Sequence, residues 1–545
     1  MLSALTMALS LALVQASPAS AAPTSVVPGW DARRAEHLWN RAGFGAGTAE
    51  VEQSVALGPE RMVAELLTAE SWIEQPFYAR KRADADLSRY FKTLPQDERD
   101  RKMDELRSED RAQMDDYLDW WVGRMLTGEE PLRERMVLFW HGHFTSSMDA
   151  VHSSYEMIQQ NQLFRRLGLG SFRALLFGVA RDPAMLLYLD NASSKKAHPN
   201  ENFARELLEL YTLGEGNYGE EDVREVARAF TGWGQENGRF VFDEKRHDDG
   251  QKRVLGVEGH LNGDDVLDIL LKQPACARHL AHALLAYFEG VEPTRARLEN
   301  YAAFLRESDW RIDAFLRRLF LDPEFYAEDK LGARVASPLD FLVGSARRLG
   351  LRPPAAALVS GASLLGQRLF FPPSVRGWEG GETWATGGSL ILRGELAGFL
   401  LGRVRGRELL GERLVASDGD APATPAPAPM EAAGERRNAG KGKAASVPAD
   451  LRAIARMDLR PQVNLTARLT RGDPTDGELA RALLEELLAT PVPPALATKV
   501  EERITRARGE LGLGDATWIS RPELCEPLLR ELAHDVLALP EAQLD

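Results

Sequence analysis

HPNENFARELLELYTLGEGNYGEEDVREVARAFTGW, residues His198–Trp233, decides the fold. Asn200 has the side chain of a helix N-cap, and Gly214 supplies a stop signal after it. A turn of about 100° per residue places the apolar side chains between them on one arc, namely Phe203, Leu207, Leu210 and Tyr211. The polar side chains fall on the opposite arc, namely Glu201, Asn202, Arg205, Glu206, Glu209 and Thr212. The stretch is therefore predicted to begin with an amphipathic helix.

A second helix is predicted to begin near Glu220 and to end at Gly232. Its buried side would carry four apolar residues, namely Val223, Val226, Ala227 and Phe230. Its polar side would carry Asp222, Glu225 and Arg228. Two consecutive amphipathic helices are typical of a mainly α-helical protein.

Composition describes an ordinary globular protein that can bury a substantial core. Of the 545 residues, 44% are hydrophobic, which is a usual share for a folded domain. The formal net charge is −14 and the pI is near 5.4. We therefore expect no nucleic-acid partner, because nucleic-acid binding requires a basic surface.

The N-terminus resembles a secretory signal. Residues 2–15 form a short apolar run, and the following ASPASAAP offers cleavage near Ala21 or Ala22. We expect a signal peptide over 1–22 and an exported protein, periplasmic or extracellular, that is not an integral membrane protein after cleavage. An uncleaved anchor is the alternative, although the run is short for a membrane span.

The rest of the chain divides into three parts. Residues 30–412 read as a large multi-helix body with one small β-hairpin, in which Phe240 and Phe242 alternate and Asp249–Gly250 forms the turn. Residues 416–450 contain 11 Ala, 5 Pro and 4 Gly and no aromatic residue, so they are predicted to be a disordered linker. Residues 451–545 are predicted to form a short helical C-terminal segment.

Standard catalytic signatures are missing from the sequence. It has no G-x-S-x-G elbow, no Walker A loop and no HExxH. Cys276 and Cys525 are its only cysteines, which excludes a cysteine-rich zinc site. Cys276 lies in a helical pattern and is expected to be a small buried thiol. Whether the two cysteines pair is left open.

Several long blocks carry a resemblance to a known family: HLWNRAGFGA (37–46), MVLFWHGHFTSS (136–147), DPAMLLYLDN (182–191), PNENFARELLELYTLG (199–214), YGEEDVREVARAFTGW (218–233), HDDGQKRVLG (247–256), SPLDFLV (337–343) and LGQRLFFPPSVRGWEGGETW (365–384). The chain resembles the bacterial domain-of-unknown-function 1800 family. The resemblance implies an exported, mostly helical protein. It also implies a partner from a second uncharacterised family, with a sulfatase-like fold, that is commonly encoded beside it. It implies no reaction and no residue roles.

We place the candidate site at the acidic motifs. Glu206 or Asp222 would act as the base, His247 and Asp248 would assist, and Arg205 would orient an anionic group. A divalent metal is a possible cofactor, and its ligands would be Glu201, Glu206, Asp222 and His247. The substrate-binding residues would be Asn200, Arg228, Arg376 and Trp378.

Two further motifs have competing interpretations. His141 and His143 lie about 200° apart if they are helical, so at most one is expected to reach the polar site. Trp378, in the loop FFPPSVRGWEGGETW, has a face that suits sugar rings or cations, but a lid packed over the body by its aromatic residues is the favoured reading.

Two functions fit these observations. The first is a hydrolase that acts on an envelope or extracellular polymer. The second is a non-catalytic envelope or secretion scaffold, in which the same polar residues form a surface or buried structural network.

Overall fold

The helix predicted after Asn200 is present in the computed structural model. The structure describes residues 27–68, 91, 93–409, 453–460, 464–470, 472–513, 518 and 521–545. The signal peptide expected over 1–22 and the linker expected over 416–450 lie outside the described residues.

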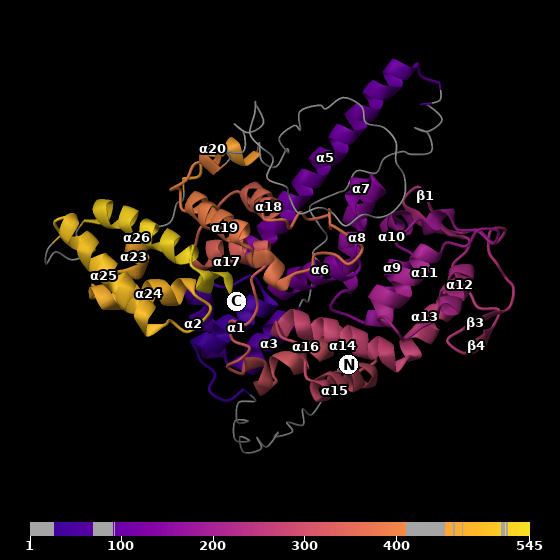
Figure 1. Ribbon diagram of the computed structural model, residues 1–545, viewed down its shortest axis with the longest axis horizontal. Helices are drawn as coiled ribbons and strands as arrows, with labels where there is room; N and C mark the ends of the chain where they lie inside the picture. The colour runs from indigo at the N-terminus through magenta and orange to yellow at the C-terminus, as the bar shows by residue number, and fades with distance from the viewer. Residues whose placement is uncertain are drawn as a thin grey trace, which may run out of the picture.

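The described chain is mainly α-helical (Figure 1). Its first part contains α1 (Ala32–Ala42), α2 (Thr48–Leu57), α3 (Pro59–Leu67), α5 (Gln96–Thr127), α6 (Pro131–His143), α7 (Met148–Val151), α8 (Ser154–Leu167), α9 (Phe172–Ala180), α10 (Pro183–Tyr188) and η1 (Asn191–Ser193). The central part contains α11 (Glu201–Glu206), the π-helix η2 (Leu207–Thr212), α12 (Glu220–Ala229), α13 (Gly263–Lys272), α14 (Pro274–Glu289), α15 (Arg295–Glu307), α16 (Ile312–Phe320) and η3 (Pro323–Tyr326).

The remaining helices follow the central part. They are α17 (Pro338–Arg348), α18 (Ala355–Leu364), η4 (Gly381–Ala385), α19 (Gly387–Leu400), α20 (Gly406–Leu409), α23 (Leu465–Leu469), α24 (Asp476–Leu487), α25 (Pro494–Glu510), α26 (Pro522–Leu537) and η6 (Pro540–Gln543). No helix among these described residues is both long and apolar enough to cross a membrane.

The strands form two hairpins instead of the one predicted. β1 (Trp233–Glu236) pairs with β2 (Arg239–Phe242), and β3 (Lys252–Val254) pairs with β4 (Val257–Gly259), both antiparallel. The pairing predicted across Asp249–Gly250 is wrong. The turn of the first hairpin is Asn237–Gly238, where both residues have positive φ. Asn-Gly is the preferred sequence of such a turn, so the signal was present in the sequence.

The C-terminal segment belongs to the same hydrophobic core as the rest of the chain. One continuous cluster of buried apolar residues includes helices of both parts. The backbone N–H of Asp545 donates to Arg334 O at 2.9 Å, and Val335 and Leu544 form an isolated antiparallel bridge. Figure 1 shows α23–α26, in yellow, beside α1, α2 and α19. The described residues of 464–545 are therefore packed onto the body.

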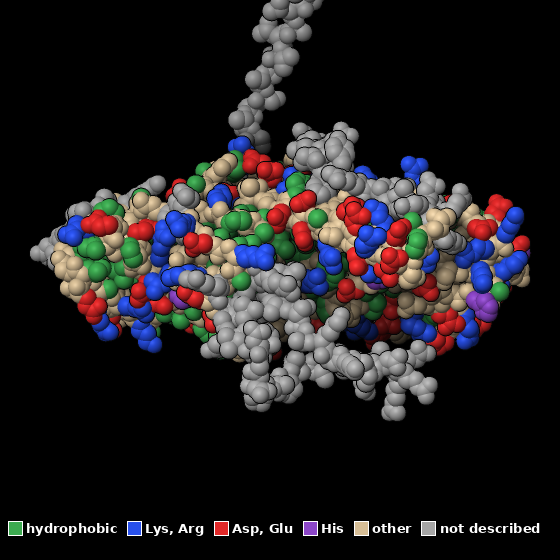
Figure 2. All heavy atoms as spheres, turned by 90° about the horizontal axis from the view of Figure 1, so that it is seen from above, with side chains coloured by type: hydrophobic (Ala, Val, Ile, Leu, Met, Phe, Trp, Pro, Cys, Tyr) green, Lys and Arg blue, Asp and Glu red, His purple; other side chains and the backbone are tan. Residues whose placement is uncertain are grey.

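The surface carries charges of both signs. Figure 2 shows basic and acidic side chains interspersed over one face of the molecule. Both cysteines are free and buried, as expected for Cys276.

Candidate functional site

Four of the motif blocks meet in one region of the fold. His143, at the end of α6, has its Nε2 atom 3.3 Å from Tyr211 O in η2. Tyr211 reaches Met185 Sδ in α10 at 3.8 Å. The loop between α18 and α19 is fixed at its start, where the backbone N–H of Phe370 donates to His141 Nε2 at 3.0 Å. Residues far apart in sequence are thereby placed together around α6 and η2.

His141 and His143 diverge as the helical spacing predicted. His141 is fully buried and accepts a hydrogen bond from the backbone of the loop after α18, whereas His143 contacts the backbone of η2. Trp378 of the same loop packs its ring against His141, with ring centroids 5.5 Å apart. The favoured reading of the loop, as a segment packed over the body by its aromatic residues, agrees with these contacts.

The helix after Asn200 changes its hydrogen-bonding pattern at the acidic positions. The backbone N–H of Leu213 donates to Leu208 O at 2.8 Å, which is the i to i−5 pattern of a π-helix. Thr212 Oγ1 donates to Leu207 O at 2.5 Å. π-Helical turns are rare and occur frequently at functional sites. Glu206 is the last α-helical residue, and Glu209 lies within the π-helix.

Glu206 differs from the neighbouring carboxylates in its surroundings. Within the described residues its carboxylate forms no hydrogen bond and no ion pair, although it is partly buried. Burial raises the pKa of Glu206, and the negative charge of Glu209 raises it further, while Arg376 and Arg205 lower it. The Glu206 charge in turn adds to the effect of burial in raising the pKa of the Tyr188 hydroxyl. These shifts make Glu206 a carboxyl group with a weakened tendency to ionise.

Glu209, three residues later, is fully engaged. One carboxylate oxygen accepts from the Tyr218 hydroxyl at 2.8 Å, and the other accepts from Arg376 Nη2 at 2.7 Å. The same Nη2 donates to Glu215 at 2.8 Å. Burial and the hydrogen bond to Glu209 raise the pKa of Tyr218 to about 12. When two nearby carboxyl groups have different environments, their pKa values differ, and one can act as an acid while the other acts as a base.

Asn200 and Arg205 of the predicted site are held by hydrogen bonds and ion pairs within the protein. The Asn200 side chain accepts from the backbone N–H of Asn202 at 2.7 Å and donates to Leu189 O at 3.0 Å, so it caps α11 as predicted. Arg205 donates two hydrogen bonds to Glu220, at 2.8 and 2.9 Å, and lies 4.0 Å from Glu201. The guanidinium of Arg205 is therefore already occupied by carboxylates.

The second part of the predicted site attaches the β3–β4 hairpin to α12. Asp222 accepts from the backbone N–H of Gly219 at 2.9 Å and of Leu255 at 2.7 Å. Arg228 donates to Asp248 at 2.7 Å. Arg228 also pairs with Glu225 at 2.8 Å. The hydrogen bond from Arg228 lowers the pKa of Asp248.

His247 lies in the turn after β2. Its Nδ1 atom is 2.8 Å from Thr231 O, and its ring packs against Phe242 at 5.2 Å between centroids. The structure does not gather Glu201, Glu206, Asp222 and His247 into one group. In the part of the chain that the structure describes, no three His, Cys, Asp or Glu side chains are arranged to hold a metal ion.

Sequence reasoning missed several residues that surround Glu206. Glu209 lay on the predicted polar arc but was not assigned a role, and Tyr188 and Tyr211 were read only as members of their motifs. The i, i+3 spacing of Glu206 and Glu209 was the available signal for the pair. Of the predicted substrate-binding residues, the structure brings Arg376 close to Glu206, whereas Arg228 belongs to the hairpin cluster.

We expect Asp222→Asn to act on stability. The substitution weakens a helix-capping interaction and the hydrogen bond to Leu255, so the free energy of unfolding should fall by about 1 kcal/mol. Urea denaturation measures the change, and amide exchange at Leu255 should become faster. Unchanged stability together with unchanged exchange would contradict this role for Asp222.

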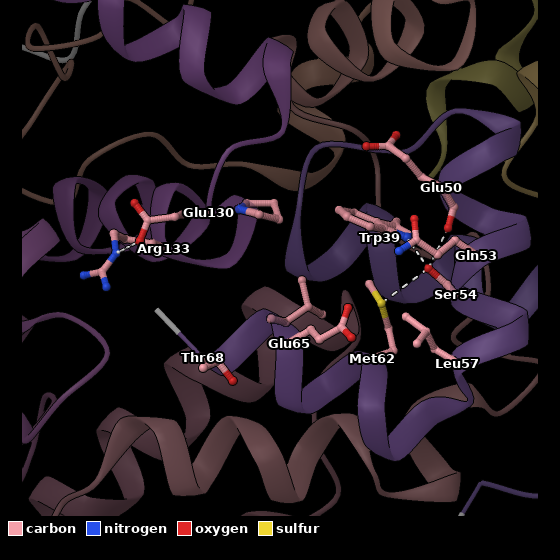
Figure 3. A pocket seen from close by; sticks show the side chains of 12 residues that line it. Trp39, Glu50, Gln53, Ser54, Leu57, Met62, Glu65, Thr68, Glu130 and Arg133 are labelled. Atoms are coloured by element: carbon pink, nitrogen blue, oxygen red, sulfur yellow. Dashed lines mark hydrogen bonds and ion pairs between the residues drawn. The ribbon is translucent and has the colours of Figure 1, made fainter. Parts of the chain in front are cut away.

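Two cavities lie elsewhere in the molecule. One, of about 320 Å³, is lined by α1–α3 and by the N-terminal end of α6, opposite the end that carries His143 (Figure 3). In it the Trp39 indole donates to Ser54 Oγ at 2.9 Å. Another, of about 650 Å³, lies between α1, α2 and α24. Neither contains a predicted site residue, so we locate the candidate site by its side-chain chemistry and not by cavity size.

Comparison with known proteins agrees with the resemblance seen in the sequence. A search of curated proteins and a search of solved structures each found no match. The family model described as "Protein of unknown function (DUF1800)" matches residues 37–544, which include both the helical body and the C-terminal segment. The chain therefore belongs to the DUF1800 family.

Proposed function

We propose that this protein is an exported hydrolase in which Glu206 transfers a proton during cleavage of an envelope or extracellular polymer. The observation that carries the proposal is the partly buried Glu206 carboxyl, which has no partner among the described residues, beside a fully paired Glu209. General acids in hydrolases are commonly carboxyl groups whose pKa has been raised toward neutrality. The pKa of Glu206 is raised, whereas the pKa of Asp248 in the hairpin cluster is lowered.

Arg376 takes the substrate-orienting role in this proposal. Only its Nη2 atom is engaged, by Glu209 and Glu215, and within the described residues its Nε and Nη1 atoms form no hydrogen bond. Each of these N–H groups suits a carbonyl or anionic oxygen of a substrate. Arg205, which the sequence suggested for this role, has its donors committed to Glu220.

Export is part of the proposal and rests on the sequence of the N-terminus. The run over 2–15 and the cleavage sites near Ala21 and Ala22 support a periplasmic or extracellular protein. A family partner with a sulfatase-like fold would then meet it outside the cytoplasm. N-terminal sequencing of protein from the producing cell should begin between residues 20 and 25, and intact Met1 on a cytoplasmic species would contradict export.

The proposed function is tested by turnover. Wild type, Glu206→Gln and the control Glu225→Gln are assayed against labelled envelope polymers and against chromogenic esters and glycosides. We expect wild type and Glu225→Gln to cleave the same substrate and Glu206→Gln to have lost the activity. Elemental analysis of the same samples shows whether a metal is retained. Equal turnover by all three proteins would refute the role of Glu206.

A direct titration tests the same carboxyl group without a substrate. The infrared difference between wild type and Glu206→Gln isolates the carboxylic acid band of Glu206. Because burial and Glu209 raise its pKa, the band should persist above the pH at which ordinary glutamates ionise. A band that has fallen to half its height by about pH 4.3, the reference pKa of glutamate, would contradict the proposal.

A non-catalytic scaffold is the second candidate, and a specific observation favours it. The contacts that hold the β3–β4 hairpin in place involve Asp222, Arg228 and Asp248. These polar groups are therefore occupied by structural partners. In a scaffold, Glu206→Gln would leave the phenotype of the producing strain unchanged. In a hydrolase it would reproduce the phenotype of a strain that lacks the protein.

A further inference from the structure

The end of the π-helix presents two backbone carbonyls to two histidines from different helices. His279 in α14 has its Nε2 atom 2.7 Å from Leu210 O. His143 at the end of α6 has its Nε2 atom 3.3 Å from Tyr211 O. The two imidazole rings are neighbours, with centroids 6.1 Å apart. The last carbonyls of any helix lack intrahelical partners, so these contacts satisfy groups that would otherwise remain unpaired.

The protonation state of both rings follows from their partners. A carbonyl oxygen only accepts, so each Nε2 carries a hydrogen and donates it. Burial, and to a smaller extent the neighbouring His279, lower the pKa of His143 to about 3. Burial also lowers the pKa of His279. Both rings are therefore neutral near pH 7, with a defined tautomer and a fixed direction of donation.

Packing holds each ring in place. His143 stacks on Phe139, with ring planes 12° apart, and meets Phe144 edge-on at 4.7 Å between centroids. His279 lies against Gly214, where a Cβ atom would be 3.0 Å from His279 Nδ1. Gly214 also has φ +80°, which favours glycine. Gly214, just after the end of the π-helix, therefore has no side chain that would crowd His279.

From this geometry we infer that His143 and His279 are positioning residues for the Glu206–Glu209 pair. By holding the carbonyls of Leu210 and Tyr211 they stabilise the i to i−5 turn. That turn sets the rotation of Glu206 relative to Glu209, and it keeps Glu206 partly buried near Tyr188 and without a partner. The inference rests on the proposed function only because that function makes Glu206 the proton-transferring group. The histidine contacts themselves do not depend on any reaction.

The test compares His279→Leu and His143→Leu with the glutamine variants at the same positions. Glutamine keeps an N–H donor at the end of its side chain, whereas leucine removes the donor. His282→Leu is the control on α14, since His282 is exposed and contacts Glu292 instead of η2. Hydrogen exchange of amides 207–213 and the infrared titration of Glu206 are measured for every variant.

We expect the leucine variants to speed amide exchange over 207–213 roughly tenfold, as the loss of one hydrogen bond predicts. We also expect them to lower the pKa of Glu206 toward its ordinary value. The glutamine variants should restore both properties, and His282→Leu should change neither. Leucine variants that match wild type in both measurements would overturn the inference, as would glutamine variants that rescue neither.

A second variant covers the case in which a leucine variant does not fold. Gly214→Ala keeps both histidines but crowds His279, so it should produce the same local exchange and the same fall in the pKa of Glu206. No change in either measurement would overturn the inference. If wild-type Glu206 titrates in the ordinary range, the proposed function fails. The exchange data still decide the role of the histidines.

Discussion

Replacing Glu134 with glutamine should lower the free energy of unfolding by about 3–5 kcal/mol, because it leaves a buried charge without its partner. Glu134 in α6 is fully buried. Its carboxylate pairs with Arg165 at 2.6 Å and with Arg124 at 2.7 Å. Arg165 is itself buried and also donates to the Tyr117 hydroxyl at 3.1 Å. The substitution would remove the buried negative charge that pairs with Arg165.

Glu129 provides a matched control for the Glu134 experiment. It pairs with the same Arg124, at 3.1 Å, but its side chain is 61% exposed. An exposed pair contributes about 0–1 kcal/mol, so Glu129→Gln should be nearly neutral. Denaturant unfolding of the two variants gives the comparison. Equal destabilisation by both would show that burial does not determine the effect.

The Glu134 prediction has a defined pH dependence. Burial acts to raise the pKa of Glu134, but Arg165 and Arg124 outweigh it and hold the pKa below the ordinary value. A carboxyl with a depressed folded-state pKa contributes stability that is present above its unfolded pKa and is lost as pH falls through the folded pKa. The difference between wild type and Glu134→Gln should therefore be full at neutral pH and should shrink in acid.

The helical part of the fold was predictable because its signals are local. The cap at Asn200, the apolar period after it and the stop at Gly214 all lie within one short stretch, and all three are present in the structure. The change to a π-helix was not predictable. It involves His143 and His279, which lie on distant helices, and no local pattern places those side chains beside η2.

The sequence indicated the region of the candidate site better than the residues that belong to it. The clustering of acidic residues indicated Glu206, but acidic residues that are close in sequence bind different partners in the structure. Asp222 and Asp248 accept backbone N–H groups of the hairpin region, whereas Arg376 reaches Glu209 from a loop 167 residues away in sequence. Spacing along a helix gives the direction of a side chain, but the partner that it meets is fixed only by tertiary packing.

Glu206→Gln should lower kcat by about 10²- to 10⁴-fold once a substrate is found, which is the usual contribution of a general acid or base. The reason is that glutamine keeps the size of the side chain but cannot supply a proton. Glu225→Gln, on the next helix, is the control and should retain near wild-type kcat. A fall of less than about tenfold would place Glu206 outside the proton transfer, since that is below the usual range.

The pH profile separates proton transfer from a general loss of structure. As a general acid Glu206 acts in its protonated form, so kcat should fall as pH rises through its raised pKa. Glu209→Gln removes the negative charge that raises the pKa of Glu206, so this limb should move to lower pH. Arg376→Ala removes a positive charge that lowers that pKa, so the limb should move to higher pH. Two variants that move one limb in opposite directions cannot be explained by lost stability, and shifts of the same sign would refute the assignment of that limb to Glu206.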